Sequence, residues 1–299
     1  LWFKKSQENH IVFMNNLNKG FIYVFNNRKI AFKSTPKWFL DPYKNLNHAK
    51  DNQHWSLIKE EKVYDLKNIW ELSRFNWCPK IAIAWRITRN KSFLNKLNKM
   101  TKDWCLKNPS NFGFNWICGQ ESSIRVINIL LTWRIINEKI PKKDFFYIEN
   151  FLVTHLERIS KTIIYAESQN NNHWISESCA LFIGGNWLKK YRPENEKGAF
   201  YASKGRKNLE KSAKKLIMKD GSFSQYSINY HRFLLDTLTQ VELWREWLFA
   251  PIFTEKFYLN CKSATLWLTK FINTKTGYCP NIGGNDGGFC YQLHNLEYN

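Results

Sequence analysis

The feature that most constrains the fold is a helical periodicity of apolar residues, which begins at Asp65 and continues nearly to the end of the chain. In DLKNIWELSRFNW, apolar or small side chains recur on one side of a helix, at Leu66, Ile69, Trp70, Ser73 and Trp77. The helix is expected to continue without a break through residues 78–90. The same pattern predicts further helices over 91–108, 118–139, 142–167, 175–189, 202–220, 230–249 and 255–273. The glycine pair Gly184–Gly185 is expected to end the helix that starts at 175. The chain is therefore predicted to be mostly α-helical.

Short connections between these helices favour antiparallel helix pairs. Such pairs can close into a ring, an (α/α) toroid, but periodicity alone does not establish closure. Residues 1–60 differ, because short runs of β-forming residues at 11–14, 21–25 and 29–32 alternate with asparagine-rich turns. We therefore expect a small extended or β-hairpin cap over 1–60 and a helical domain over 61–299.

The composition allows a large core and favours an anionic partner. Hydrophobic residues make up 43% and aromatic residues 16% of the 299 residues, so the chain is not a disordered tail. Lysine and arginine outnumber aspartate and glutamate by 45 to 25, and a net charge of +20 attracts acidic polysaccharide, nucleic acid or anionic membrane. The lysines are scattered with no dense basic block, so charge alone does not select among these partners.

Several other kinds of site find no support in the sequence. The seven cysteines form no CxxC pair and lie mostly in apolar surroundings, which is typical of buried free thiols. No apolar run approaches the ~20 residues of a transmembrane helix, and no signal-peptide pattern is present. Nucleotide-binding glycine loops, HExxH, GxSxG and zinc-ligand spacings are absent, so neither metal nor cofactor is expected.

Chemically versatile side chains gather where loops lead into helices. The junctions are NWICGQESSIR, NNNHWISES and GSFSQYSINYHRF, and the glycine-rich NIGGNDGG lies in the tail. Taken singly, each has an ordinary structural explanation: Asn172 or a neighbour as a helix cap worth about 1 kcal/mol, Tyr230 as packing, and Glu121–Arg125 as a surface ion pair. Loops held by a rigid scaffold are also where binding sites are usually built. Both explanations stay open at this point.

Five blocks occur in order over roughly residues 65–288: DLKNIWELSRFNWCPKIAIAWRIT, CGQESSIRVINILL, ESQNNNHWISESCALFIGG, KDGSFSQYSINYHRFLLDTL and PNIGGNDGG. Together they resemble the heparinase II/III-like polysaccharide lyases, including their oligoalginate lyase relatives. The most specific parts are NNNH with the following helix, and S-x-x-Y-H after DGSF. The resemblance implies an (α/α) toroid with an open cleft. The toroid is expected to be incomplete here. Complete members of the family continue into a C-terminal β-sandwich that adds a further catalytic histidine, and the resemblance implies such a domain beyond residue 299.

Members of that family cut uronic-acid polysaccharides by β-elimination, so the resemblance implies a carbon–oxygen lyase. The reaction removes the C5 proton of a uronate and expels the C4 oxygen, which leaves a 4,5-unsaturated sugar. Because the neighbouring carboxylate is already negative, the enzyme must neutralise it and stabilise the enolate-like charge that develops. Amide and imidazole donors suit this task without a metal, and a side chain near C5 then takes the proton.

The resemblance also implies roles for individual residues. The family's Asn-His pair falls on Asn172 and His173, which would grip the carboxylate, with His173 also a candidate base. The catalytic tyrosine falls on Tyr230, as base, acid or both. A tyrosine base needs nearby positive charge to lower its pKa from about 10, and His231 and Arg125 are the candidates for that charge.

Further residues are expected to bind substrate or support the site. Glu121 is expected to orient Arg125. Trp116, Trp174 and Gln120 are expected to line subsites, Arg74 and Glu71 to lie on the substrate side or in the scaffold, and Asn285 and Asp286 to match the family's tail motif.

The expected partner is an acidic polysaccharide of heparin/heparan, alginate or capsular type, with no nucleic acid and no membrane insertion; the oligomeric state is not fixed. The family favours a bacterial periplasmic or secreted location, and a cytoplasmic one stays open. A second hypothesis is a non-catalytic binder of acidic glycan in bacterial surface-polysaccharide metabolism. A third, a nucleic-acid binder, rests on charge and aromatic residues alone and predicts a basic stripe away from the asparagine junction.

Overall fold

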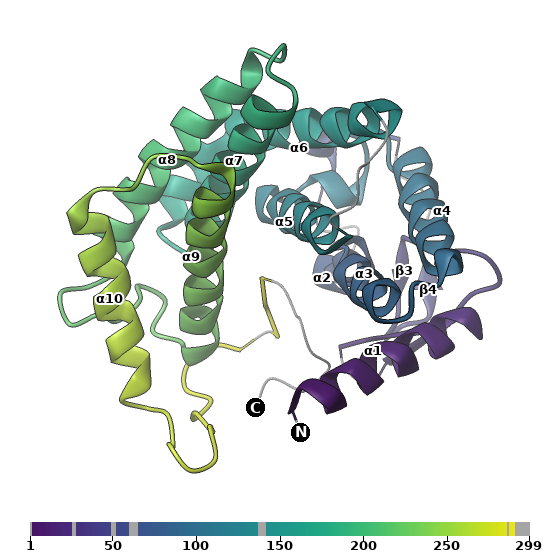
Figure 1. The fold of residues 1–299 in the computed structure, drawn as a ribbon, viewed down its shortest axis with the longest axis horizontal. Coiled ribbons are helices and arrows are strands. Elements are labelled where there is room, and N and C mark those ends of the chain that lie inside the picture. The colour runs from purple at the N-terminus through teal and green to yellow at the C-terminus, as the bar shows by residue number, and fades with distance from the viewer. Residues whose placement is uncertain are drawn as a thin grey trace. The chain divides into compact units, whose positions relative to one another are not determined.

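The computed structural model describes residues 2–25, 28–48, 52–59, 65–136, 142–285 and 287–290. The chain divides into two compact units, and Figure 1 labels their helices α1 to α10. Unit 1 contains the described residues of 1–121 and 128–139, and unit 2 those of 122–127 and 140–291. The predicted domain boundary at residue 60 lies outside the described residues and stays a prediction.

Unit 1 begins with a helix and two short antiparallel strand pairs. The elements are α1 (Trp2–Asn18), β1 (Phe21–Val24), β2 (Arg28–Ala31), β3 (Leu40–Asp41) and β4 (Leu46–Asn47). β1 pairs with β2 in a register that sets Phe21 opposite Ala31, which confirms the predicted strands at 21–25 and 29–32. The predicted strand at 11–14 is wrong, because His10, Met14 and Leu17 are buried at a spacing that puts them on one face of α1.

The rest of unit 1 is helical. It comprises η1 (Trp55–Leu57), α2 (Leu66–Ser73), α3 (Trp77–Thr88), α4 (Lys91–Lys107), η3 (Phe114–Trp116) and most of α5 (Gly119–Ile136). α2 and α3 were predicted as one continuous helical stretch, but a break at residues 74–76 separates them, with Phe75 in the left-handed region at a φ of 64°. The Asn128 side-chain amide donates to the freed carbonyl oxygen of Arg74 at 2.9 Å, so the break is satisfied from α5.

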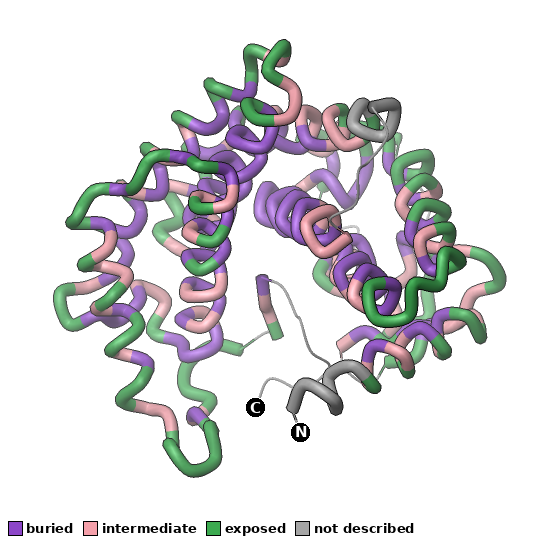
Figure 2. The backbone as a smooth tube through the Cα atoms, viewed as in Figure 1, coloured by how far each residue is buried: buried purple, intermediate pink, exposed green. Residues whose placement is uncertain are grey.

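Unit 2 consists mainly of long helices. They are α6 (Lys142–Gln169), α7 (Asn172–Tyr191), α8 (Lys197–Leu216), α9 (Ile228–Leu248) and α10 (Glu255–Thr269), joined by residues 122–127 of α5. α7 is buried almost all round from Trp174 to Leu188, as the purple backbone in Figure 2 shows. A helix buried on every side belongs to the interior of its unit.

The glycine pair in α7 lets two helices touch, and the prediction that it ends the helix is wrong. α7 continues through Gly184 and Gly185 to Tyr191. A Cβ added at Gly185 would lie 2.2 Å from the backbone nitrogen of Ala202 in α8, and one at Gly205 would lie 2.3 Å from that of Phe182 in α7. Glycine is therefore required on both helices for their backbones to approach this closely.

The mostly helical fold with small antiparallel strand pairs is confirmed. None of the seven cysteines forms a disulfide, and four of them, at 78, 179, 279 and 290, are buried. Over the described part of the chain, no helix combines the length and apolar character that crossing a membrane requires.

Candidate active site

The three asparagines at 170–172 have different structural roles. Asn170 adopts left-handed geometry, with a φ of 50°. Asn171 is the N-cap of α7, and its side-chain oxygen accepts a 2.9 Å hydrogen bond from the backbone N–H of His173. Asn172 is therefore not needed as the cap, and no described residue hydrogen-bonds its side-chain amide, although it is only 3% exposed. Its amide stays available to a ligand.

A second loop, residues 217–227, reaches this junction. The side-chain oxygen of Gln225 accepts a 2.9 Å hydrogen bond from the backbone N–H of Asn172. The Ser224 hydroxyl donates to the Asn170 carbonyl oxygen at 2.9 Å. Because this loop leads directly into α9, these bonds tie the start of α7 to the segment that carries Tyr230.

The tail packs against the start of α9. Ser227 caps that helix: its hydroxyl oxygen accepts from the Tyr230 N–H at 3.3 Å and donates to the Gly284 carbonyl at 2.6 Å. The Asn229 side-chain amide donates to the Gly288 carbonyl at 3.2 Å. Gly283 has a φ of 82°, and a Cβ there would lie 2.2 Å from the Tyr226 carbonyl oxygen, so only glycine allows this contact.

Unit 2 thus brings together three motifs that are separate in the sequence: NNNH, SQYSINYH and the glycine-rich tail. His173 and Tyr230 are half-buried beside these contacts. Asn285 is exposed and shapes the tail turn, since its side chain donates to Asn281 and accepts from the Gly287 N–H, each at 2.9 Å. Asp286 lies outside the described residues.

Arg125 is fully buried in the part of α5 that belongs to unit 2. Its guanidinium donates to His155 Nε2 and to the Ser122 hydroxyl, each at 3.1 Å. His155 Nε2 must therefore be unprotonated, and Nδ1 carries the hydrogen that is donated to the Phe151 carbonyl at 2.8 Å. Burial, and then the Arg125 cation, hold the pKa of His155 well below its usual range. His155 lies on α6, and no motif in the sequence marked it.

His231 and Trp174 occupy core positions. The His231 ring is fully buried, lies 2.8 Å through Nε2 from the Ala264 carbonyl and stacks on Trp267 at 4.7 Å. Burial lowers the pKa of His231, which keeps the ring neutral near pH 7. Trp174 is 1% exposed, and its indole N–H donates to Asn208 of α8 at 3.0 Å. These positions favour packing over the expected roles in supplying charge and lining a subsite.

In unit 1, Glu121 has a different partner from the one expected. Its two carboxylate oxygens accept from the Arg74 guanidinium at 2.7 and 2.8 Å, so the predicted pairing with Arg125 is wrong. Arg74 also donates to Glu71 at 2.9 Å. Desolvation raises the pKa of Glu71 against the attraction of Arg74, and desolvation also lowers the pKa of the nearby Lys80 to about 8. Because Arg74 and Glu71 belong to this buried ion network, the structure favours a scaffold role for both residues.

The remaining expected subsite residues also lie in unit 1. Trp116 is 1% exposed and packs on Trp104 with ring centroids 6.2 Å apart, while Gln120 is 8% exposed. Among the described residues, no group of three or more histidine, cysteine, aspartate or glutamate side chains is arranged to hold a metal ion.

Comparison with solved structures shows what this fold resembles. A crystal structure of heparinase III matches with a TM-score of 0.59 at 16% identity, over 90% of this chain and 38% of that one. A heparan sulfate lyase HepC mutant from Pedobacter heparinus matches with a TM-score of 0.55 at 19% identity, over 79% of this chain and 36% of that one. A heparinase III gene product matches with a TM-score of 0.54 at 16% identity, over 76% of this chain and 37% of that one. At these identities the likeness shows a shared fold.

The chain thus spans less than two fifths of the length of these structures. No curated protein matches its sequence. The profile described as the heparinase II/III N-terminus matches residues 10–271, which is most of the chain. The chain belongs to the heparinase II/III N-terminus family.

Proposed function

We propose that this protein cleaves a uronic-acid-containing polysaccharide by β-elimination, and that unit 2 carries residues for the reaction. The observation that supports this most strongly is the hydrogen-bonded meeting of the Asn172 junction, the Gln225 loop and the start of α9. The similar structures, named as heparinase III and heparan sulfate lyase, favour heparan-type chains over alginate or capsular polymers. Such a substrate favours a bacterial periplasmic or secreted location, and the family fold favours closure of the helices into an (α/α) toroid.

The first requirement is to neutralise the uronate carboxylate. The Asn172 amide suits this role, because Asn171 has taken over the cap and Gln225 fixes the Asn172 backbone. His173 follows directly and supplies the second donor. Donors held in place before the reaction stabilise developing negative charge without a reorganisation cost.

The second requirement is to move two protons. Breaking the C5–H bond supplies the electron pair for the C4=C5 double bond, and the C4–O4 bond then breaks with its electrons on O4. We assign protonation of O4 to Tyr230, because its phenol O–H can donate a proton to the leaving oxygen. The base is His173 or the ionised Tyr230. Arg125 keeps its charge at all relevant pH values and is the remaining candidate to favour a tyrosinate.

The decisive experiment is an assay of the natural-length protein against heparan sulfate, heparin, alginate and other uronate polymers. Ultraviolet absorbance of the 4,5-unsaturated product reports turnover. Tyr230→Phe is expected to lower kcat by about 10³-fold while sparing substrate binding. Tyr165→Phe removes a hydroxyl from a 68% exposed tyrosine of α6 and is the matched control.

Three results decide between the assignments. Absence of unsaturated product on every polymer would overturn the lyase proposal, and retained glycan affinity would then identify a non-catalytic binder. If His173 is the base, His173→Gln lowers kcat and removes the acidic limb of the pH–kcat profile. If Tyr230 is the only base, the same variant mainly raises KM.

A further inference from the structure

Helix α8 carries an unusual excess of positive charge. Of its 20 residues, seven are basic and Glu210 is the single acid. Leu209, Ala213 and Leu216 are buried, whereas Lys207, Lys211 and Lys214 are exposed at spacings of four and three residues. These spacings place the lysines on one side of the helix, over about 10 Å of its length. Like charges at these spacings destabilise a helix, so folding alone does not explain the arrangement.

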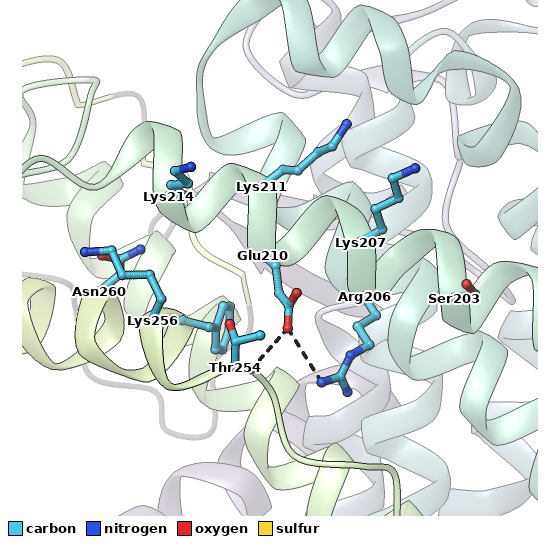
Figure 3. Close-up of a pocket in the computed structure, with 10 residues that line it drawn as sticks. Ser203, Arg206, Lys207, Glu210, Lys211, Lys214, Thr254, Lys256 and Asn260 are labelled. Atoms are coloured by element: carbon cyan, nitrogen blue, oxygen red, sulfur yellow. Dashed lines mark hydrogen bonds and ion pairs between the residues drawn. The ribbon is translucent and has the colours of Figure 1, made fainter.

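The lysines border a hollow between α8 and α10. Its volume is about 460 Å³, and its lining includes Lys207, Lys211 and Lys214 from α8, and Lys256 and Asn260 from α10. We call these four lysines and the space they border the lysine groove. Figure 3 shows Lys207 and Lys211 projecting from the same side of α8, while Arg206 and Glu210 turn toward Thr254.

Glu210, the single acidic residue that lines the hollow, already has bonding partners. Glu210 accepts a 3.1 Å hydrogen bond from the Thr254 backbone N–H and lies 3.5 Å from the Arg206 guanidinium. Arg206 in turn donates to the carbonyl oxygens of Pro251 and Ile252 and lies over the Phe253 ring. Arg206 and Glu210 therefore fix the segment between α9 and α10, and they leave the lysines uncompensated.

The groove lysines have no ion-pair partner among the described residues, and the Asn260 amide nitrogen, buried in the wall, has no hydrogen-bond partner there. Lysine is a flexible point charge suited to sulfate and carboxylate groups. The lining offers no exposed aromatic ring on which bases could stack, because its phenylalanine, Phe257, is 3% exposed. A chain of acidic sugars fits these features better than a nucleic acid does.

We infer that the lysine groove is a second binding site for acidic polysaccharide, separate from the α7–α9 junction, with which it shares no residue. The choice of ligand rests on the proposed function, whereas the charge of the groove does not. By holding a distant part of a long chain, the groove raises the effective concentration of that chain at the junction. Long chains therefore gain affinity from the groove, and short oligosaccharides bound at the junction do not.

The test compares binding by a neutralised groove with binding by a neutralised control surface. In the groove variant, Lys207, Lys211, Lys214 and Lys256 are replaced by Gln; in the control, the exposed Lys189, Lys219, Lys270 and Lys275 are replaced by Gln. Fluorescence anisotropy with labelled heparan sulfate chains measures Kd at 0.15 M salt, in a Tyr230→Phe background so that the probe stays intact. The groove variant is expected to bind about 10-fold more weakly and the control within about 2-fold.

The outcomes separate this inference from the lyase proposal. Binding needs no turnover, so the groove result stands even where the lyase assay yields no product. When the groove substitutions are made in a protein that keeps Tyr230, kcat on short oligosaccharides is expected to be unchanged. Equal weakening in both variants, or no weakening in either, would overturn the site. Tighter binding of duplex DNA or single-stranded RNA than of heparan sulfate at the same salt would overturn the ligand assignment.

Discussion

The backbone N–H of Asn172 donates a 2.9 Å hydrogen bond to the side-chain oxygen of Gln225, 53 residues further along the chain. The bond links the first residue of α7 to the loop that enters α9, so Asn172 and Tyr230 are positioned by a shared contact. Under the proposed function, Gln225 is therefore a positioning residue, which acts through Asn172.

Gln225→Met keeps the length of the side chain and removes the acceptor. Because small displacements of catalytic groups are costly, kcat is expected to fall by about 10-fold to 100-fold with little change in KM. Steady-state kinetics on a uronate polymer measures both parameters. Gln169→Met, at an exposed residue at the end of α6, is the control. A lowered melting temperature with kcat intact would show that Gln225 is only structural.

Glu121→Gln tests the buried pair with Arg74. Both Glu121 oxygens bind this arginine, so the substitution weakens a bidentate contact and leaves Arg74 undercompensated. The free energy of unfolding is expected to fall by about 3 kcal/mol, against about 0.5 kcal/mol or less for Glu157→Gln, whose pair with Lys161 is exposed. Urea unfolding of both variants measures the difference. Similar losses in the two would show that burial adds nothing to the Glu121 pair.

The helices could be predicted because their periodicity is local. The predictions that failed concern residues whose packing or bonding partners are distant in the sequence. The glycine pair at 184–185 reads as a helix end until α8 is placed against α7. The segment around Ile11 is rich in β-forming residues, yet the burial of Met14 and Leu17 on one face makes it a helix. Glu121 meets Arg74, 47 residues away, and no spacing rule finds such a pair.

The candidate site, like the fold, could be predicted from the sequence only in part. The ordered motifs singled out Asn172, His173 and Tyr230, and the structure brings the loops around them together. The motifs carry no information on burial, so His231 and Trp174 were expected near substrate although both are buried. His155 was missed because its contact with Arg125 joins α6 to α5, and neither residue lies in a motif with the other.

His155 makes stability depend on pH in a calculable direction. Its pKa is well below the usual range in the folded protein and near 6.5 when unfolded, so the unfolded chain binds the proton more readily. The contribution of neutral His155 to the free energy of unfolding is fully present above about pH 6.5. It is lost as the pH falls from there toward the folded-state pKa, by about 1.4 kcal/mol per pH unit.

His155→Gln cannot take up this proton, so its unfolding free energy is expected to fall less steeply than that of the parent between pH 7 and pH 5. Urea unfolding at four pH values measures the two slopes. His231, whose pKa burial also lowers, is present in both proteins and cancels in the comparison. Parallel curves for His155→Gln and the parent would contradict the burial of a neutral imidazole.

Gly205→Ala tests the contact between α7 and α8. The new Cβ would lie 2.3 Å from the Phe182 backbone nitrogen and 2.7 Å from its Cα, and backbone atoms cannot rotate away as a flexible side chain would. The helices must separate, which is expected to cost about 1–3 kcal/mol and to lower the melting temperature by about 2–4 °C for each kcal/mol. In an open helix the same change would stabilise by up to about 1 kcal/mol, so the sign of the effect is diagnostic. Gly284→Ala, where a Cβ meets nothing within 4 Å, is the control for melting temperature. An unchanged or raised melting temperature for Gly205→Ala would show that the two backbones do not touch.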